Sequence, residues 1–490
     1  MKTTLIIITF LITAFSAKSQ ILNPGFEQTT PQNKPLIWGI KPPANFSYTL
    51  DTVAKHSGIN ALKITGTQTS KTEFVPFSQI INISVNRLEN IKLTAFIKTQ
   101  ALKGNAALWC QIWDRNDKQI GFQNSEMQDL FVNGDTDWKK YNLVLSVDTN
   151  AKKLLIGGYV SGDGTAWFDD FNLEQSAKSA EDASQMVSNY VKEFKTIVKT
   201  NSIYTDSLNW EQIDKDLQQL AKGLNTISEA KVLTDYIIKQ LRKVGDNHSF
   251  VQSKTNADNY TRTNSNPLKP KAKLLGSKIG YIYVPGFAST NKTVSLQFTD
   301  TIQNLIKNLE HNNPIKNWVV DLRDNTGGNM YPMIAGLGPL IGDGTLGYFI
   351  KATVKEDIKN RWFYKNGATG TGKNSIILKL KNSYLLKHKA PNVAVLIGKK
   401  TSSSGEMTAM SFIGKPNLKT FGQATGGYTT GNRIFRLSNG TALVLATSLT
   451  ADRNKKRYLS SIMPDVVVEK TKDDTDAELK AAENWLLNKD

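Results

Sequence analysis

Hydrophobic and polar residues alternate with a period of two in the early part of the chain. Segments such as Ile91–Ile97, Tyr141–Leu145 and Leu154–Tyr159 show this alternation, and turns separate them. A strand with one buried and one exposed face produces such a pattern, and many short strands at this spacing are typical of a β-sandwich. We therefore predict an all-β sandwich over residues 20–175.

The pattern then changes to a helical period. Met186, Tyr190, Phe194 and Ile197 recur three or four residues apart, and a second helix is expected to follow an N-cap at Ser228. These two helices predict a helical subdomain over residues 176–250.

From Lys278 onward, apolar strands alternate with amphipathic helices. Ile279–Val284 and Trp318–Leu322 are short apolar runs, and Phe298 and Ile302 lie on one face of a helix between them. Such units imply a layered α/β domain with a largely parallel sheet, which we expect over residues 251–490. A chain of 490 residues is also too long for one hydrophobic core, so a multidomain protein is expected.

The first 19 residues have the pattern of a signal peptide. Met1-Lys2 is a short basic start, Leu5–Phe15 is an apolar stretch, and Ala17–Ser19 fits a cleavage site with small residues. We therefore expect a secreted or periplasmic protein. No other apolar run approaches the roughly 20 residues that a membrane span needs, so no transmembrane segment is expected.

Composition excludes several classes of site. Cys110 is the only cysteine, which rules out an internal disulfide and a cysteine-based metal site. The net charge is +18, but the lysines are scattered and the longest basic cluster is Lys455–Arg457. This distribution favours a solvated basic surface, and we expect no nucleic-acid partner.

A serine cluster follows the apolar run Val393–Ile397. Ser402, Ser403 and Ser404 stand where a strand is expected to turn into a helix. There, free amide N–H groups and the positive end of the helix dipole can stabilise an oxyanion beside a serine nucleophile. The alternative is structural, because Ser403 and Glu406 have the spacing of a capping box.

A serine nucleophile needs a base, and the unperturbed pKa of histidine suits that role. His56 belongs to the predicted sandwich, whereas His311 and His388 stand in polar surroundings typical of the surface. His248, just after a helix, is the remaining candidate. A packing or capping role for His248 is the alternative.

Five ordered motifs resemble the tail-specific (C-terminal processing) and tricorn-type serine peptidase family. They are Gly245–Ser249, Asp321–Gly328, Thr401–Glu406, Gly422–Gly427 and Pro464-Asp465, and they extend from residue 245 to residue 465. The resemblance implies a crotonase-like catalytic fold, a peptide or protein substrate and no required cofactor. It also implies that Ser403 is the nucleophile, and that the N–H of Ser404 and one from Gly327-Gly328 form the oxyanion hole.

The chain departs from this family at two places. No lysine stands in Thr425–Thr430, where members with a Ser/Lys pair have one, so a pair with His248 is expected instead. No glutamate precedes Pro464-Asp465 as it does in the tricorn-type branch, which leaves Asp246, Ser249 and Asp452 as candidates for orienting His248. Too few residues separate Ser249 from Lys278 for an inserted PDZ domain.

The predicted sandwich resembles the galactose-binding-like jelly rolls of carbohydrate-binding modules at Leu22–Glu27 and Gly164–Phe171. This resemblance makes a structural calcium ion and a glycan contact candidate features. The candidate calcium ligands are Glu27, Asp169 and Asp170, and the candidate sugar-stacking residues are Trp109, Trp113 and Trp138. The alternatives are solvated carboxylates and core packing.

The sequence thus predicts a secreted or periplasmic serine hydrolase, a peptidase that uses Ser403 and His248. A ligand-binding protein that keeps the same fold with weak or no turnover is the rival hypothesis, since the expected glutamate is missing. Polysaccharide adhesion through the sandwich is a third.

Overall fold

The computed structural model describes residues 21–67, 73–175, 181–261, 268–350, 360–469 and 476–489, so the expected signal peptide lies outside the described residues. The chain forms two compact units. The first holds the chain up to Val191 together with Trp210–Tyr236, and the second holds Lys192–Asn209 and Ile237 onward. No helix in the described ranges has the length and hydrophobicity of a transmembrane span.

The boundaries between the units fall within two helices. These are α1 (Gln185–Asn201) and α3 (Ile227–Lys243), whereas α2 (Trp210–Ala221) belongs to the first unit. The segment 176–250, which we expected as a separate helical subdomain, is therefore divided between the two units.

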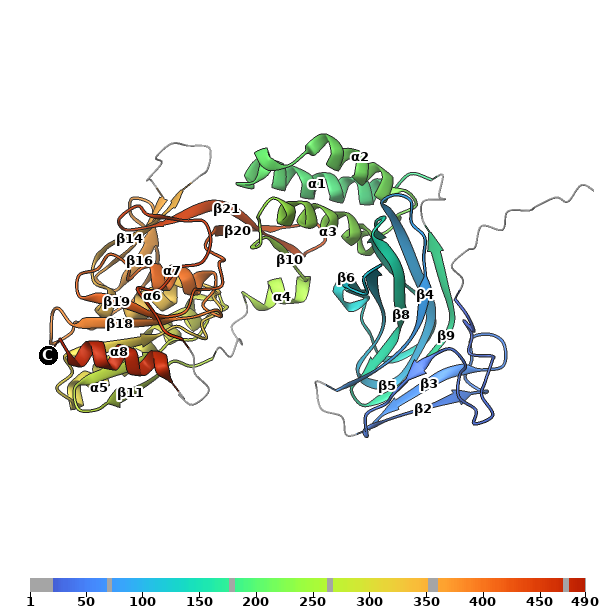
Figure 1. The fold of residues 1–490 in the computed structure, drawn as a ribbon, viewed down its shortest axis with the longest axis horizontal. Coiled ribbons are helices and arrows are strands. Elements are labelled where there is room, and N and C mark those ends of the chain that lie inside the picture. The colour runs from blue at the N-terminus through green and yellow to red at the C-terminus, as the bar shows by residue number, and fades with distance from the viewer. Residues whose placement is uncertain are drawn as a thin grey trace, which may run out of the picture. The chain divides into compact units, whose positions relative to one another are not determined.

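Antiparallel strands build the first unit (Figure 1). They are β1 (Gly39–Ile40), β2 (Phe46–Asp51), β3 (Ala61–Gly66), β4 (Phe74–Asn82), β5 (Glu89–Asp114), β6 (Gln119–Asn124), β7 (Val132–Val147), β8 (Ala151–Ser161) and β9 (Gly164–Gln175). The first half of β5 pairs with β7 and β9, and its second half pairs with β6 and β8. One core that includes the fully buried Phe26, Phe77 and Phe168 holds these strands together. The predicted β-rich N-terminal region is confirmed.

Polar contacts join the helices of the first unit to its strands. The carboxylate of Glu229, whose side chain is only 3% exposed, accepts hydrogen bonds from Lys92 Nζ at 2.5 Å and Asn142 Nδ2 at 2.9 Å. Asn90 Nδ2 also donates to Leu220 O. A buried carboxylate needs such partners, so the strands and these helical segments depend on each other.

The candidate calcium ligands lie together, but protein donors occupy their oxygens. Asp169 Oδ2 accepts from the N–H groups of His56 and Ser57, Asp170 Oδ1 accepts from Ser57 Oγ, and Glu27 accepts from Ile59 N. Within the described ranges no three or more His, Cys, Asp or Glu side chains are grouped so that they could hold a metal ion. A structural calcium ion stays a prediction.

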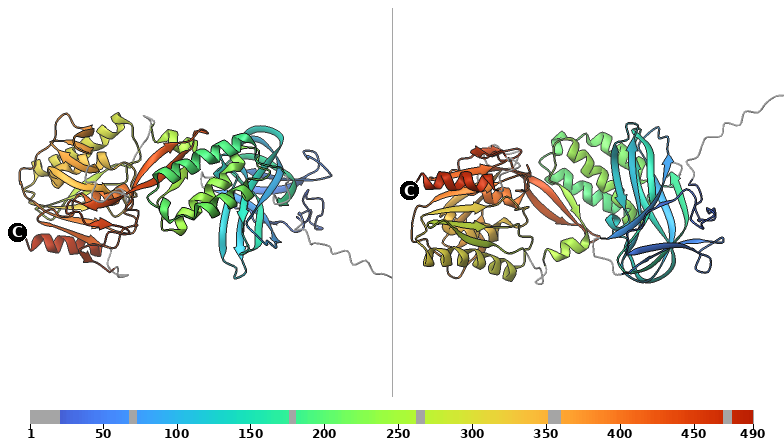
Figure 2. Two further views of the ribbon diagram at one scale, coloured as in Figure 1. Left: turned by 90° about the horizontal axis from the view of Figure 1, so that it is seen from above. Right: turned by 60° about the horizontal axis from the view of Figure 1, so that its bottom comes forward.

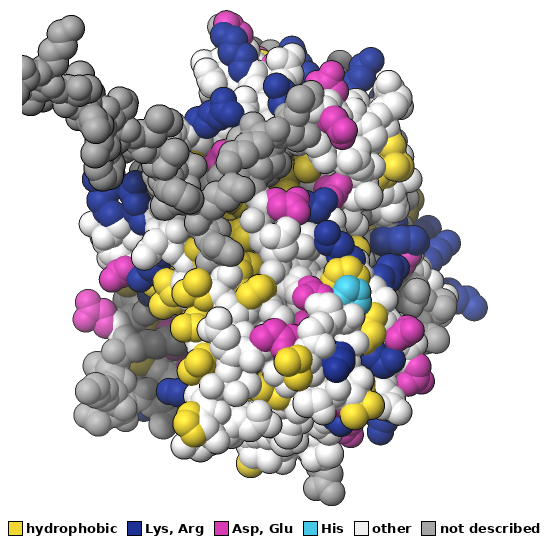
Figure 3. Space-filling model, turned by 90° about the vertical axis from the view of Figure 1, so that its right-hand side faces the viewer, with side chains coloured by type: hydrophobic (Ala, Val, Ile, Leu, Met, Phe, Trp, Pro, Cys, Tyr) yellow, Lys and Arg dark blue, Asp and Glu magenta, His cyan; other side chains and the backbone are white. Residues whose placement is uncertain are grey.

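The three tryptophans named for glycan stacking differ in burial. Trp109 is buried and its indole N–H donates to Gly158 O, so it packs in the core. Trp113 and Trp138 are half-buried. On the face of this unit that Figure 3 shows, hydrophobic side chains lie scattered among polar and charged ones. A glycan contact stays a prediction.

Two sheets and several helices form the second unit (Figures 1 and 2). Its strands are β10 (Phe250–Gln252), β11 (Lys271–Leu275), β12 (Ile279–Tyr283), β13 (Asn317–Asp321), β14 (Gly344–Ile350), β15 (Arg361–Lys365), β16 (Ala368–Thr371), β17 (Ser375–Lys379), β18 (Asn392–Ile397), β19 (Leu418–Gly422), β20 (Gly431–Arg436), β21 (Ala442–Asp452), β22 (Arg457–Tyr458) and β23 (Val466–Val467). Its helices besides α1 and α3 are α4 (Lys254–Asn259), α5 (Lys292–Asn312), α6 (Met330–Ile341), α7 (Ser404–Met410) and α8 (Ala477–Leu487).

The central sheet has the order β11-β12-β13-β18-β19-β23 and is parallel except for the pair β11–β12. Alternate residues of its strands pack on opposite sides. Val319 and Leu396 contact α8, whereas Val320 and Val395 share a core with α5, α6 and α7. Figure 2 shows α8, in red, on one side of this sheet. The predicted layered α/β arrangement with a largely parallel sheet is confirmed.

The second sheet contains a three-stranded antiparallel arm. β21 is its middle strand, β10 pairs with one edge of β21 and β20 with the other, and further along β21 pairs with β14. Because β10 directly follows His248, this pairing fixes where that histidine lies.

Candidate active site

Ser403 lies in the turn between strand β18 and helix α7. Its backbone angles are φ 55° and ψ −122°, a conformation that non-glycine residues rarely adopt. Such a conformation costs on the order of 1–3 kcal/mol and persists only where surrounding contacts hold it. This backbone conformation directs the Ser403 side chain out of the turn at the N-terminus of α7.

The buried carboxylate of Glu406 holds this turn. It accepts hydrogen bonds from the backbone N–H of Ser403 at 2.9 Å, from the N–H of Gly427 at 2.9 Å and from the hydroxyl of Thr425. Burial raises the pKa of Glu406, and the hydrogen bonds from Thr425 and the backbone oppose that rise. The contact from Ser403 N is the one expected of a capping box, so the structural and the catalytic interpretations of Ser403 are compatible.

Gly327 is packed directly against the Ser403 turn. A Cβ atom at this position would lie 2.7 Å from Ser402 O and 2.9 Å from Ser403 Cβ, and the φ of Gly327 is +99°. Only glycine fits such a backbone without displacing its neighbours. Its N–H donates to Asn325 Oδ1 at 3.0 Å, which holds the glycine pair in place.

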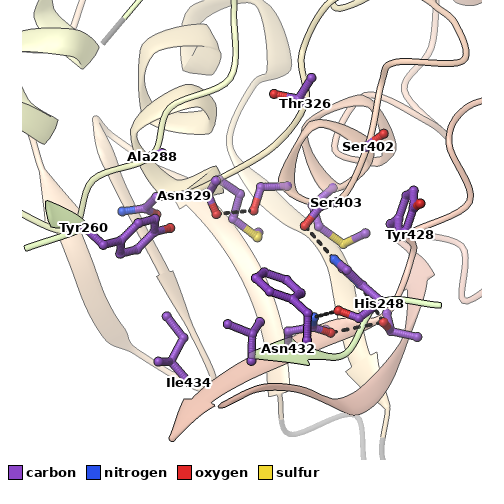
Figure 4. A pocket seen from close by; sticks show the side chains of 18 of the residues that line it. His248, Tyr260, Ala288, Thr326, Asn329, Ser402, Ser403, Tyr428, Asn432 and Ile434 are labelled. Carbon is purple, nitrogen blue, oxygen red and sulfur yellow. Dashed lines mark hydrogen bonds between the residues drawn. The ribbon is translucent and has the colours of Figure 1, made fainter. Parts of the chain in front are cut away.

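Only one of the three clustered serines faces the histidine. Ser403 Oγ lies 2.9 Å from His248 Nε2. Ser404 Oγ donates instead to Gly328 O at 2.7 Å, and Ser402 points away from His248 (Figure 4). The sequence-predicted pair of Ser403 and His248, 155 residues apart, thus comes within hydrogen-bond distance.

The sequence candidates for orienting His248 act elsewhere. Asp246 accepts from the backbone N–H groups of His248 and Ser249 and from Ser249 Oγ, so it fixes the turn before β10. Asp452 accepts from Tyr458 Oη and from two backbone N–H groups of its own turn. Their hydrogen bonds go to groups other than the imidazole ring.

A hydroxyl and an amide contact the far side of His248 instead. Thr430 Oγ1 lies 2.8 Å from His248 Nδ1 and donates to Asn432 Oδ1 at 3.1 Å, while Asn432 Nδ2 donates to His248 O at 3.0 Å. Neither Thr430 nor Asn432 was predicted from the sequence. Thr430 lies in the segment that was noted for its lack of lysine, but nothing in its linear context distinguishes it from its neighbour Thr429.

This chain of contacts determines the tautomer of His248. The carbonyl of His248 can only accept, so the amide nitrogen of Asn432 must face it and Asn432 Oδ1 must face Thr430. Thr430 therefore donates its proton to Asn432 and accepts from His248 Nδ1–H. In the neutral ring Nε2 is then unprotonated and accepts the hydroxyl proton of Ser403.

Burial keeps His248 neutral. It lowers the pKa of His248 to about 4, and a hydrogen bond to the backbone of Thr430 opposes this shift. At neutral pH the ring is therefore a base with a free Nε2. Lys400, three residues before Ser403 in the sequence, is exposed and pairs with Asp324 at 3.0 Å.

Two backbone N–H groups lie beside the Ser403 turn without a protein acceptor among the described residues: those of Ser404 and Gly328. The hydrogen bond from Ser404 Oγ to Gly328 O keeps these two peptides adjacent. The N–H of Gly327 is engaged by Asn325, so Gly328 is the member of the glycine pair that can donate to an oxyanion.

A cavity of about 690 Å³ opens in front of Ser403. Figure 4 shows Ser403 and His248 on one side of it and Tyr260 and Ala288 across from them. Asn432 of β20 lies next to His248, and Ile434 lies further along β20, on the side of Tyr260. This volume is in the usual range for sites that bind small molecules or a few residues of a peptide.

Comparison with known proteins relates the second unit to peptidases. The chain matches the family described as Peptidase family S41 over residues 278–468, which include Ser403 and the glycine pair, whereas His248 precedes the match. The Nisin-resistance protein of Lactococcus lactis subsp. lactis is 31% identical over 269 residues, which are 54% of this chain and 78% of that protein.

Two solved structures are also similar. A lipoprotein from Streptococcus agalactiae is 27% identical with a TM-score of 0.49, and the match covers 62% of this chain and 97% of the lipoprotein. The photosystem II D1 C-terminal processing protease is 11% identical with a TM-score of 0.39, and the match covers 61% of this chain and 97% of the protease.

Proposed function

This chain belongs to peptidase family S41 and is a serine-type peptidase, and we propose that Ser403 and His248 hydrolyse the peptide bond of its substrate. The observation that carries the proposal is the 2.9 Å contact between Ser403 Oγ and His248 Nε2. The tautomer of His248 and its lowered pKa support it, since both leave Nε2 free to accept a proton.

In the first step His248 Nε2 takes the hydroxyl proton while Ser403 Oγ bonds to the carbonyl carbon. The carbonyl oxygen becomes an oxyanion that accepts from the N–H groups of Ser404 and Gly328. His248 then gives its proton to the leaving amine as the C–N bond breaks, which yields an acyl-enzyme. A water molecule then attacks the acyl carbonyl carbon while His248 Nε2 takes its proton. The bond to Ser403 Oγ breaks, Oγ regains a proton from His248, and the carboxylic acid product is released. Thr430 Oγ1 accepts from Nδ1–H throughout, which keeps Nε2 as the nitrogen that exchanges the proton.

We extend the proposal to the finer architecture. A parallel sheet between two helical layers supports a crotonase-like fold for the second unit, and long antiparallel strands support a galactose-binding-like jelly roll for the first. The basic start and apolar stretch within residues 1–19 support a location outside the cytoplasm, secreted or periplasmic. The division at residues 20–175, 176–250 and 251–490 belongs to the same proposal as a division by type of secondary structure, although the compact units divide the helices of 176–250 between them.

Labelling with a fluorophosphonate probe tests the nucleophile. Wild type and Ser402→Ala should be labelled, because the Ser402 side chain faces away from His248. Ser403→Ala should not be labelled although it stays folded by circular dichroism. Equal labelling of wild type and Ser403→Ala would overturn the assignment.

Absence of labelling in a folded wild type would favour the rival function, a ligand-binding protein with weak or no turnover. Among the described residues no carboxylate is hydrogen-bonded to the imidazole ring of His248, and this observation favours the rival, since Thr430 supplies no negative charge to stabilise an imidazolium.

A further inference from the structure

One wall of the cavity beside His248 is a row of apolar side chains across the three-stranded arm. Phe250 of β10 is opposite Val444 of β21, which is opposite Ile434 of β20. Residues in register across antiparallel strands share one face, and all three line the cavity. Ile434 follows Asn432 by two residues, so the row lies about 7 Å along the strand from the residue that contacts His248.

Two members of this row are largely exposed. Phe250 is 40% exposed and Ile434 is 50% exposed, although both are large apolar residues on a sheet. Ile377 of β17 also lines the cavity and is exposed. Apolar side chains left uncovered in a concave site beside a reactive group are typical of ligand contacts.

Charged side chains are kept out of the same cavity. Among the described residues that line it there is no Asp, Glu, Lys or Arg, although 21% of the chain is charged. Two arginines of β20 are directed elsewhere: Arg436 donates to Asp258 and to backbone carbonyls, and Arg433 lies over the ring of Phe435. A substrate charge would find no partner here and would lose its hydration.

We propose that this row binds a large apolar side chain of the peptide substrate within two residues of the scissile bond, and that it discriminates against charged side chains there. Phe250, Val444 and Ile434 are the specificity-determining residues. The inference rests on the proposed function, because the position of the scissile bond is taken from Ser403.

Binding of short alanine peptides to Ser403→Ala, measured by calorimetry, tests the proposal without requiring turnover. Each peptide carries one leucine or one lysine, and the position of that residue is scanned. At one position leucine should bind roughly 10- to 100-fold more tightly than lysine, which is the range that a well-formed apolar pocket provides. No position with more than a twofold preference would overturn the inference.

A second variant assigns the preference to the row. Adding Ile434→Asp to Ser403→Ala should abolish the preference for leucine and favour lysine. Adding Ile376→Asp should leave the preference unchanged, because Ile376 is a 55% exposed isoleucine of β17 that does not line the cavity. An unchanged preference in the Ile434→Asp variant would also overturn the inference.

Fluorophosphonate labelling of the wild type separates the two proposals. If the wild type is labelled but no peptide shows a leucine preference, the proposed function stands and the proposed apolar subsite is rejected. If the peptides show a leucine preference but the wild type is not labelled, the apolar subsite stands and the proposed function is rejected.

Discussion

Replacing Thr430 with valine tests whether a hydroxyl group orients the imidazole ring of His248, which is the role of a carboxylate in other serine hydrolases. Valine keeps the branched side chain and removes the oxygen that lies 2.8 Å from His248 Nδ1. Nδ1–H then loses its side-chain acceptor, and Asn432 Oδ1 loses the proton that Thr430 donates at 3.1 Å. The preference of His248 for the tautomer with the proton on Nδ1 and a free Nε2 is therefore weaker in the variant than in the wild type.

The size of the effect follows from the hydrogen bond that is lost. A neutral hydrogen bond contributes about 0.5–1.5 kcal/mol, and about 1.4 kcal/mol changes a rate tenfold. The backbone of Thr430 still interacts with the ring and limits the loss. We therefore expect Thr430→Val to react with the probe about three- to tenfold more slowly than the wild type. This loss in rate is much smaller than the loss that removal of the His248 side chain would cause.

The assay is the second-order rate of fluorophosphonate labelling at pH 7, with Thr430→Ser as the matched control. Serine keeps the hydroxyl and should stay within about twofold of the wild type, since it retains the hydrogen bond. The acid limb of the pH–rate profile should also move to lower pH in Thr430→Val, because a protonated ring loses an acceptor. If valine and serine variants label at the same rate as the wild type, Thr430 does not orient His248.

Three further predictions concern pH, the glycine turn and stability. Because burial lowers the pKa of His248 to about 4, the labelling rate should stay level from neutral pH to about pH 5 and halve near pH 4, as the ring becomes protonated; a midpoint at an ordinary histidine value near 6.5 would contradict this. Gly327→Ala should abolish labelling in a folded protein, since its Cβ would displace Ser403, whereas Gly276→Ala, at a positive φ with no neighbour within 4 Å, should label normally. Lys92→Met should lower the free energy of unfolding of the first unit by about 1–3 kcal/mol in a urea titration, because the buried carboxylate of Glu229 loses a charged hydrogen-bond donor but keeps its others. An unchanged midpoint would show that the pair contributes nothing.

The elements with a strong periodic pattern were predictable from the sequence. The strands that flank α5 follow from short apolar runs, and the turn at Ser403 follows from an apolar run that ends at Gly398 and the serine cluster; these signals are local. Ser403 and His248 could be named because the motifs around them resemble a known family. The contacts of Thr430 and Asn432 could not, since a single hydroxyl or amide has no periodic signal and its partner is set by the register of β20 on β21.

The sequence also did not predict that α1 and α3 are each divided between the two compact units. The period of α1 and α3 predicts helices, but it does not tell which neighbours bury each end. That choice is made by tertiary contacts such as the one between Lys92 and Glu229, whose sequence separation of 137 residues gives no local signal.

The pairing of β10 with β21 has a consequence for the timing of activity during biosynthesis. The strand that follows His248 pairs with Ala442–Val444, which leave the ribosome almost 200 residues later. Thr430 and Asn432 are likewise made after Ser403. A nascent chain therefore carries Ser403 and His248, the proposed nucleophile and base, before their site is formed, and we expect the site to form only when synthesis of the second unit is nearly complete.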